Sequence, residues 1–364
     1  MTAADLKTEI ASEGSVVIGS EYPAGQGAVA AAFARHIQAT YGVQIGVTFS
    51  PIGIGTDALS PVYDAVESGS AAPFDVVATR KDHWFGAKIH AQASGVPVME
   101  AFLPSDLIPN EARLFGLTKS EPTAVGFQSA AVPTVIFNAD TVDYLEDWTD
   151  LGDERMKGRL LLWAPGDVIS DGMFLSMTGA LKMDYRNPDH VTAAITYMAE
   201  KIHPNALKYT TDLDEVKSLI TAGTVDAVVH WSSLARDLYS GGMTSVKALL
   251  PTLGQYPFCG VLWIPVGVQH PVMAQLFIDW RISVDAQMPD LNEWGIDQAT
   301  WLNLHEGLIG RDYAEAIPLW LKDTYRSFYP PADRISKEYW DLDWEYYLAN
   351  ASAWREEWTA ALNR

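Results

Sequence analysis

Apolar runs alternate with amphipathic segments along the first part of the chain. Residues 15–20 form an apolar run that predicts a buried strand, and residues 28–41 show an alanine-rich helical pattern that ends at Gly42. A second predicted strand and helix follow in residues 43–68, and a third strand is expected at residues 74–79. Strands that alternate with helices at this spacing predict a parallel sheet with helices on both faces.

A change of pattern near Ala131 predicts where the chain leaves this sheet. Two extended segments, 124–128 and 132–137, follow each other with little helix between them, and the alternation of strands and helices then returns. We therefore predict an α/β fold of two doubly wound lobes joined by a hinge. The predicted boundaries are residues 1–130 plus 265–325 for lobe 1, 131–264 for lobe 2, and 326–364 for a helical tail that packs on the lobes.

The apolar run that ends at His230 and Trp231 predicts a strand that breaks into a helix. Ser232 and Ser233 follow, and we expect their side chains to cap that helix. Ligands of open α/β sheets bind at the carboxyl ends of strands, so Trp231 is a candidate binding surface. His230 is expected to point to the other side of the strand as a packed residue.

Aromatic residues in the tail recur at spacings of three and four. This spacing places them on one face of a helix that begins near Asp343, and such a face is usually packed against a core. The residues are Trp344, Tyr347, Leu348, Ala351, Trp354 and Trp358. We therefore leave these tryptophans out of the predicted ligand site.

Composition narrows the function classes. The 364 residues are 48% hydrophobic, which is enough to bury the cores of two lobes. The formal net charge of −21 argues against a nucleic-acid or anionic-membrane binder, because phosphate surfaces would repel the chain. Cys259 is the only cysteine, which excludes an intramolecular disulfide and a zinc site of the CxxC type. We predict no cofactor and no metal site.

The sequence leaves the compartment open. No apolar run reaches the roughly 18 residues of a membrane span, and the first residues lack the pattern of a signal peptide. The protein is therefore either cytoplasmic or has had a leader removed.

Motifs of common enzymes are mostly missing. We find no Gly-x-Ser-x-Gly elbow, no phosphate-binding Gly-x-x-x-x-Gly-Lys and no His-Glu-x-x-His. The spacing Gly53-x-Gly55-x-x-Ala58 imitates a dinucleotide fingerprint but follows the second strand, without the supporting acidic residue. Asp167, Asp171 and His230 could serve a hydrolase or transferase, which stays an alternative to a non-enzymatic binder.

A series of local segments between about residues 14 and 290, from the Gly-rich second turn and the Phe74-Asp-Val-Val strand to Phe277-Ile-Asp-Trp, resembles the type II periplasmic solute-binding proteins of ABC importers. Four of these segments carry most of the likeness. They are Ser20-Glu21-Tyr22 after the first strand, Trp148-x-Asp150-Leu151, Val-His-Trp231-Ser and Gly260-Val-Leu-Trp263. The pattern is most similar to the spermidine/putrescine-binding family, whose Glu-Tyr, middle Trp and return-strand Trp fall on Glu21-Tyr22, Trp231 and Trp263. Gly19 replaces the family's first-loop Trp, and Arg80-Lys81 stand where neutral residues are expected.

The resemblance implies a ligand site between two lobes that close about a hinge. We expect an extracytoplasmic or periplasmic monomer that captures a small amine-bearing solute, polyamine-like or zwitterionic, and works with a membrane permease. Aromatic faces attract an ammonium group and carboxylates neutralise it. The expected ligand-binding residues are Ser20, Glu21, Tyr22, Thr79, Asp82, Gln128, Asp167, Asp171, Trp231, Ser232 and Trp263.

An anionic ligand is the main alternative. Several loops lie at predicted helix N-termini, where backbone N–H groups attract anions, and Arg80 and Lys81 are near one of them. A carboxylate or phosphonate could then replace the amine as the recognised group. A sensor module on the same fold is a further possibility, since a fold does not fix a function.

Overall fold

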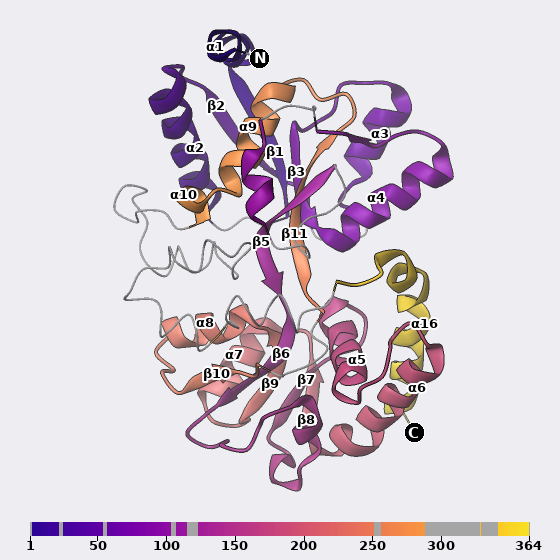
Figure 1. The fold of residues 1–364 in the computed structure, drawn as a ribbon. Coiled ribbons are helices and arrows are strands. Elements are labelled where there is room, and N and C mark those ends of the chain that lie inside the picture. The colour runs from indigo at the N-terminus through magenta and orange to yellow at the C-terminus, as the bar shows by residue number, and fades with distance from the viewer. Residues whose placement is uncertain are drawn as a thin grey trace. The chain divides into compact units, whose positions relative to one another are not determined.

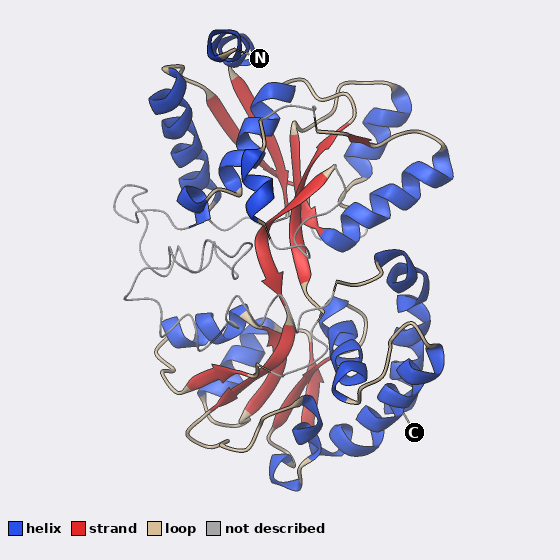
Figure 2. Cartoon of the chain, viewed as in Figure 1, coloured by secondary structure: helices blue, strands red, loops and turns tan. Residues whose placement is uncertain are grey.

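The computed structural model describes residues 2–21, 25–53, 57–102, 107–114, 123–250, 256–287, 328 and 341–363, with residues 3 and 128–131 described by their backbone alone. The chain divides into two compact units, coloured along the chain in Figure 1. Unit 1 comprises Met1–Ala130 and Phe258–Ile317, and unit 2 comprises Ala131–Pro257 and Pro318–Arg364. Each unit has a sheet of its own, shown in red in Figure 2.

The strands of unit 1 are β1 (Ser15–Ser20), β2 (Gly46–Pro51), β3 (Val76–Arg80), β4 (Met99–Glu100), β5 (Ala124–Ala131) and β11 (Phe258–Pro265). They are arranged in the order β2-β1-β3-β11-β4, and β5 pairs with β11. β1 runs parallel to β2 and β3, whereas β11 runs antiparallel to β3. The sheet is therefore mixed, with its parallel part formed by the first three strands of the chain.

Helices cover both faces of this sheet. They are α1 (Ala3–Glu13), α2 (Gln26–Tyr41), α3 (Ser60–Ser68), α4 (Lys81–Ser94), the 3-10 helix η1 (Pro109–Arg113), α9 (Pro271–Arg281) and α10 (Val284–Gln287). In Figure 1, α3 and α4 lie on one side of the strands, and α2 and α9 lie on the other. The Phe33 ring of α2 packs edge-on against Phe277 of α9, with centroids 5.2 Å apart. Because both faces are covered, β3 is buried along almost its whole length.

The strands of unit 2 are β6 (Pro133–Asn138), β7 (Leu160–Trp163), β8 (Ala206–Thr210), β9 (Ala227–Trp231) and β10 (Val246–Ala248). Their order is β10-β6-β9-β7-β8, in which β7 runs parallel to β8 and β9. β6 runs antiparallel to β9, with Pro133 opposite Trp231. Unit 2 thus repeats the mixed sheet of unit 1.

The helices of unit 2 are α5 (Val168–Ala180), α6 (Pro188–Tyr197), α7 (Leu213–Thr221), α8 (Ser233–Ser240) and α16 (Trp344–Leu362). Short helical turns are η3 (Trp148–Gly152), η4 (Glu154–Met156), the π-helical η5 (Met198–Ile202) and η6 (His203–Asn205). The tail helix α16 packs on α5 and α6, and the predicted apolar face is buried apart from the half-buried Leu348. Among the helices that the structure describes, none has the length and apolar character to cross a membrane.

Two features differ from the sequence prediction. The return strand was expected in lobe 2 up to residue 264, but β11 belongs to unit 1, because Gly260–Trp263 pair with β3. The helical pattern of the sequence here covers residues 173–181, but helix α5 begins at Val168. It begins earlier because the Asp167 side chain accepts hydrogen bonds from two backbone N–H groups of its first turn.

Candidate functional site

The carboxyl ends of β1 and β3 bring four titratable side chains together. Glu21 follows β1, Arg80 ends β3, and Asp82 and His83 lie in the first turn of α4. The parallel pairing of β1 with β3 continues past the strand end, where the Glu21 N–H donates to the Ala78 carbonyl (3.1 Å). This pairing places the Glu21 side chain next to Arg80 and His83.

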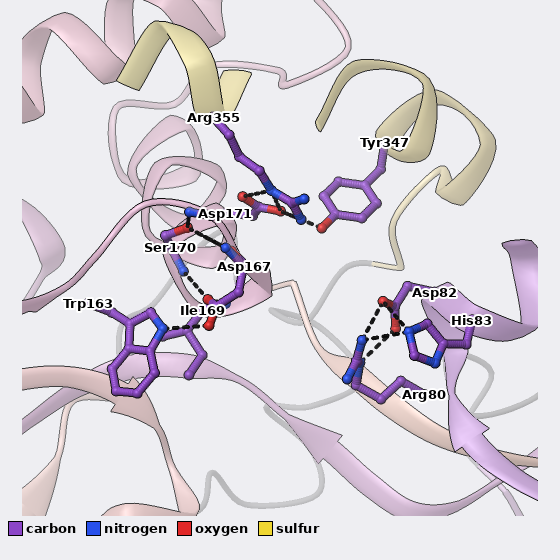
Figure 3. A network of polar contacts seen from close by, with 11 residues as sticks. Arg80, Asp82, His83, Trp163, Asp167, Ile169, Ser170, Asp171, Tyr347 and Arg355 are labelled. Atoms are coloured by element: carbon purple, nitrogen blue, oxygen red, sulfur yellow. Dashed lines mark hydrogen bonds and ion pairs between the residues drawn. The ribbon is translucent and has the colours of Figure 1, made fainter. Parts of the chain in front are cut away.

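Hydrogen bonds join these four side chains into one network. Arg80 donates to both carboxylate oxygens of Asp82, from Nε (3.0 Å) and from Nη2 (3.1 Å), as Figure 3 shows. Arg80 Nη2 also lies 2.9 Å from His83 Nε2, and His83 Nδ1 lies 2.5 Å from Glu21 Oε1. A guanidinium can only donate, so His83 Nε2 accepts and the proton of a neutral imidazole sits on Nδ1, from which it is donated to Glu21.

The acidic side chains of this network are more buried than the basic ones. The side chains of Glu21 and Asp82 are 1% and 9% exposed, whereas those of His83 and Arg80 are 14% and 23% exposed. Glu21 Oε2 accepts a further hydrogen bond from the Arg80 backbone N–H (3.3 Å) and lies 3.8 Å from Nη1. The two carboxylates therefore support the guanidinium from inside, and the cation is the member that a solute can reach most easily.

Trp263 does not lie at a surface. Its ring is fully buried in the core of unit 1 together with Trp84 and Val77, and its indole N–H donates to the buried Thr79 hydroxyl (3.1 Å). A ligand wall needs an exposed ring face, which this position does not provide. Thr79 is likewise a core residue, because its hydroxyl serves the indole.

Gly19 explains the missing first-loop tryptophan. A Cβ atom at this position would lie 2.7 Å from the Phe74 ring, so the ring occupies the place of any side chain. Ser20, next along β1, is buried. Tyr22 and the side chain of Gln128 lie outside the described residues, so their predicted roles stay predictions.

Asp167 is a helix cap in unit 2. One oxygen accepts from the Ile169 N–H (2.8 Å) and the Ser170 N–H (3.3 Å), and the other accepts from the Trp163 indole (2.6 Å) (Figure 3). These donors hold the start of α5 to the end of β7. The carboxylate expected to neutralise an amine is thus engaged within the chain.

Asp171 lies one turn further along α5 and is fully buried. It accepts from Arg355 Nε (3.0 Å) and Nη2 (2.6 Å) and from the Tyr347 hydroxyl (2.6 Å), all on the tail helix α16 (Figure 3). Burial raises the pKa of Asp171 to about 6, against the opposing effect of Arg355. Its visible role is to fix α16 to α5, which differs from the predicted contact with a ligand.

Trp231, at the end of β9, is half-buried and keeps part of its ring accessible. Ser232 is buried, and its hydroxyl has no hydrogen-bond partner among the described residues. The predicted cap is wrong, because Ser232 has helical backbone angles and makes no side-chain bond to α8. Of the predicted residues in unit 2, Trp231 and Asp167 are half-buried, whereas Asp171 and Ser232 are buried.

His230 is packed, as its place on the strand predicts. Its ring meets Trp163 edge-on at 4.9 Å, and burial lowers the pKa of His230 to about 4. No hydrogen bond among the described residues joins it to Asp167 or Asp171. The three groups therefore do not form the acid–base pair that the hydrolase or transferase alternative requires.

The described residues include no metal-binding cluster and contain only part of the dinucleotide-like motif. No group of three or more His, Cys, Asp or Glu side chains there could hold a metal ion. Cys259 is buried in β11. Gly55 of the dinucleotide-like spacing lies outside the described residues.

Sequence reasoning missed His83 and Arg355. His83 could have been found from its position directly after a strand end, where Asp82 had already been selected. Arg355 carried no such signal, because its partner Asp171 lies 184 residues away in the chain.

Comparison with known proteins rests on structure. No family model matches the chain, and no curated protein does. An extracellular solute-binding protein from Bordetella parapertussis matches with a TM-score of 0.73 at 16% identity, covering 96% of this chain and 99% of that one. The spermidine/putrescine-binding protein PotD from Streptococcus pneumoniae matches with a TM-score of 0.69 at 15% identity, covering 96% and 99%.

The Atu4243 GABA receptor matches with a TM-score of 0.68 at 17% identity, covering 96% of this chain and 97% of that one. At such low identities the likeness concerns the fold. The chain therefore has the type II periplasmic binding fold, and the predicted α/β fold class is confirmed.

Proposed function

We propose that this protein is the solute-binding component of an ABC importer. It acts outside the cytoplasm as a monomer, captures a small solute and delivers it to a membrane permease. The fold supports this function, because proteins that share it include an extracellular solute-binding protein and PotD.

The observation that carries the proposal is the network around Arg80. It lies at the carboxyl ends of parallel strands, where α/β sheets bind their ligands. Two buried acids fix the guanidinium in one orientation, so it loses little freedom when a solute binds. A preorganised, partly exposed guanidinium suits a carboxylate or phosphonate group.

The favoured solute therefore carries an anionic group, and an amine-bearing zwitterion is included in this class. A simple polyamine fits less well, because Glu21, Asp82, Asp167 and Asp171 are each paired within the chain. The similarity to a GABA receptor is in keeping with a zwitterion, since GABA has one carboxylate and one amine.

An amine-bearing solute without an anionic group is the second candidate. The accessible part of the Trp231 ring supports it, because an ammonium group over an indole gains about 0.5–2 kcal/mol. Replacement of Trp231 by alanine would then weaken binding of the amine more than binding of a dicarboxylate.

Calorimetry with a small ligand set tests the proposal. We would titrate γ-aminobutyrate, succinate, an aminophosphonate, putrescine and spermidine into the wild type, Arg80→Met and Glu21→Gln. Solutes with an anionic group should bind best, and Arg80→Met should weaken them by about 2–5 kcal/mol. Glu21→Gln should weaken them less than Arg80→Met does, because it keeps the size of the side chain and one acceptor oxygen beside Arg80 and His83.

Arg155→Met is the matched control, since Arg155 forms an exposed pair with Asp153 on unit 2 and should not affect affinity. Tight binding of putrescine that survives Arg80→Met and fails in Glu21→Gln would contradict the anionic class and favour the amine. Turnover of any of these solutes would contradict the binder itself.

A further inference from the structure

One guanidinium in unit 1 is buried and has no counter-charge within the part of the chain that the structure describes. Arg281 ends α9 and is 6% exposed, and no hydrogen bond or ion pair joins its side chain to any residue that the structure describes. Its guanidinium carbon lies 5.3 Å from the centroid of the Phe127 ring of β5. Burial lowers the pKa of Arg281 to about 10, so the group stays charged at neutral pH.

A second buried arginine shows what is missing. Arg236 on α8 is 5% exposed, and its Nε and Nη2 donate to the Asp237 carboxylate at 3.1 and 2.9 Å. Acidic residues outnumber basic ones by 46 to 25 in this chain, so a carboxylate partner would be easy to supply. The lack of one at Arg281 among the described residues therefore calls for an explanation.

The acids nearest to Arg281 in sequence are engaged or turned outward. Asp279 accepts from the Asn110 backbone and side chain, both at 2.9 Å. Asp285 is exposed. The aromatic ring and the C-terminal end of α9 stabilise a cation, but they do not replace the solvation that a buried guanidinium loses.

The surroundings of Arg281 are held firmly. The buried Gln287 amide donates to the carbonyl oxygens of Phe127 and Arg281, both at 2.8 Å, and so ties α10 to β5 and to the end of α9. Figure 1 shows α9 and α10 next to each other within unit 1. The backbone that carries Arg281 is therefore fixed, and its guanidinium offers five N–H donors.

We propose that Arg281 binds a small free anion, of the size of chloride or formate, in a site formed by α9 and β5. Because Arg281 is only 6% exposed, a small ion can reach it from solvent more easily than a large solute can. The anion supplies the missing counter-charge and makes the stability of unit 1 depend on anion identity. The site is independent of the solute proposed for Arg80.

The test compares melting temperatures at constant ionic strength and constant sodium. Chloride, formate and acetate would each be exchanged against a bulky organic sulfonate for the wild type, Arg281→Met and Arg236→Met. At a concentration of ten times its dissociation constant, the small anion should raise the wild-type melting temperature by about 3 °C. Arg236→Met should keep this shift, and Arg281→Met should lose it.

NMR of the anion tests binding to the wild type directly and does not require that a variant fold. Exchange with the wild type should broaden the ³⁵Cl signal of chloride or the ¹³C signal of formate, and excess of the other ion should reverse the broadening. Equal shifts of the melting temperature in the wild type and in Arg281→Met would overturn the proposal. It would also be overturned if neither the melting temperature nor the NMR signals of the ions changed with the anion for the wild type. Either result would show that the guanidinium needs no free anion.

Discussion

Arg80 in unit 1 and Arg355 in unit 2 each pair with an aspartate, but one pair lies within a single strand end and the other joins two helices that are remote in sequence. Arg80 reaches Asp82, two residues further along the chain, and the pair is completed by side chains at neighbouring strand ends. Arg355 reaches Asp171 across 184 residues and fixes the tail helix to α5. Both guanidinium groups are partly exposed, so exposure alone does not distinguish them.

The difference lies in what is lost when each pair is removed. A pair that joins remote elements contributes to the stability of the fold, because removing one partner leaves a buried charge between them. A pair within one strand end holds a surface in place while the fold rests on other contacts. We therefore expect the pair in unit 2 to control stability and the pair in unit 1 to control affinity.

Asp171→Ala should have the largest effect. It leaves Arg355 and the Tyr347 hydroxyl without their acceptor, and loss of one partner of a buried pair costs about 3–5 kcal/mol. Urea denaturation should show this decrease in the free energy of unfolding. Asp153→Ala removes an exposed pair and should leave the midpoint close to that of the wild type. Loss of solute binding without loss of stability would instead place Asp171 in the ligand site.

Replacing each of the two arginines by methionine tests the comparison directly. Arg80→Met should reduce affinity for an anionic solute by about 2–5 kcal/mol, while Arg355→Met should lower stability and leave affinity nearly unchanged. Calorimetry and denaturation on both variants measure the two quantities side by side. If both variants lost stability alone, the network at the strand ends would be structural and the solute would bind elsewhere.

Local patterns in the sequence were enough to predict individual strands and helices. The strand predicted at residues 15–20 is observed with the same bounds, because an apolar run with defined ends is a local property. The tail helix was predicted on the same grounds, and Trp344, Trp354 and Trp358 of its predicted face are buried.

The candidate site depended on information that is not local. Trp231 and Trp263 both stand near the ends of apolar runs, but β11 lies between β3 and β4 in its sheet, so Trp263 is enclosed in the core. Sheet order is set by pairing between distant strands and cannot be derived from one strand. Asp171 appeared available for a ligand because its partner lies on the tail helix, far away in sequence.

The pH dependence of stability should reveal two opposing groups in unit 2. The pKa of His230 falls from 6.5 to about 4 on folding, so its stabilising contribution is present above pH 6.5 and is lost as the pH falls through 4. The pKa of Asp171 rises from 3.8 to about 6, so its contribution is present below pH 3.8 and is lost as the pH rises through 6. Each is worth at most about 3 kcal/mol, and the two largely cancel in the wild type.

Single variants should expose these contributions. As the pH falls from 6.5 to 4, His230→Leu should gain stability relative to the wild type, and Asp171→Asn should lose it. Urea denaturation at several pH values in this range measures both differences. Parallel curves for the wild type and both variants would show that neither group changes its pKa on folding.

Asp167→Ala should have the smallest effect and still separate a cap from a ligand contact. The change removes the acceptor of two N–H groups at the start of α5 and of the Trp163 indole, which together should cost about 1–2 kcal/mol. Asp167→Asn keeps an acceptor oxygen and should recover part of that loss. Trp163→Phe removes the indole donor alone and gives its share. If Asp167 instead neutralised a bound amine, Asp167→Asn would abolish affinity for amines, because the amide carries no charge. Denaturation and calorimetry on the same three variants distinguish these outcomes, and a cap predicts that stability changes while affinity does not.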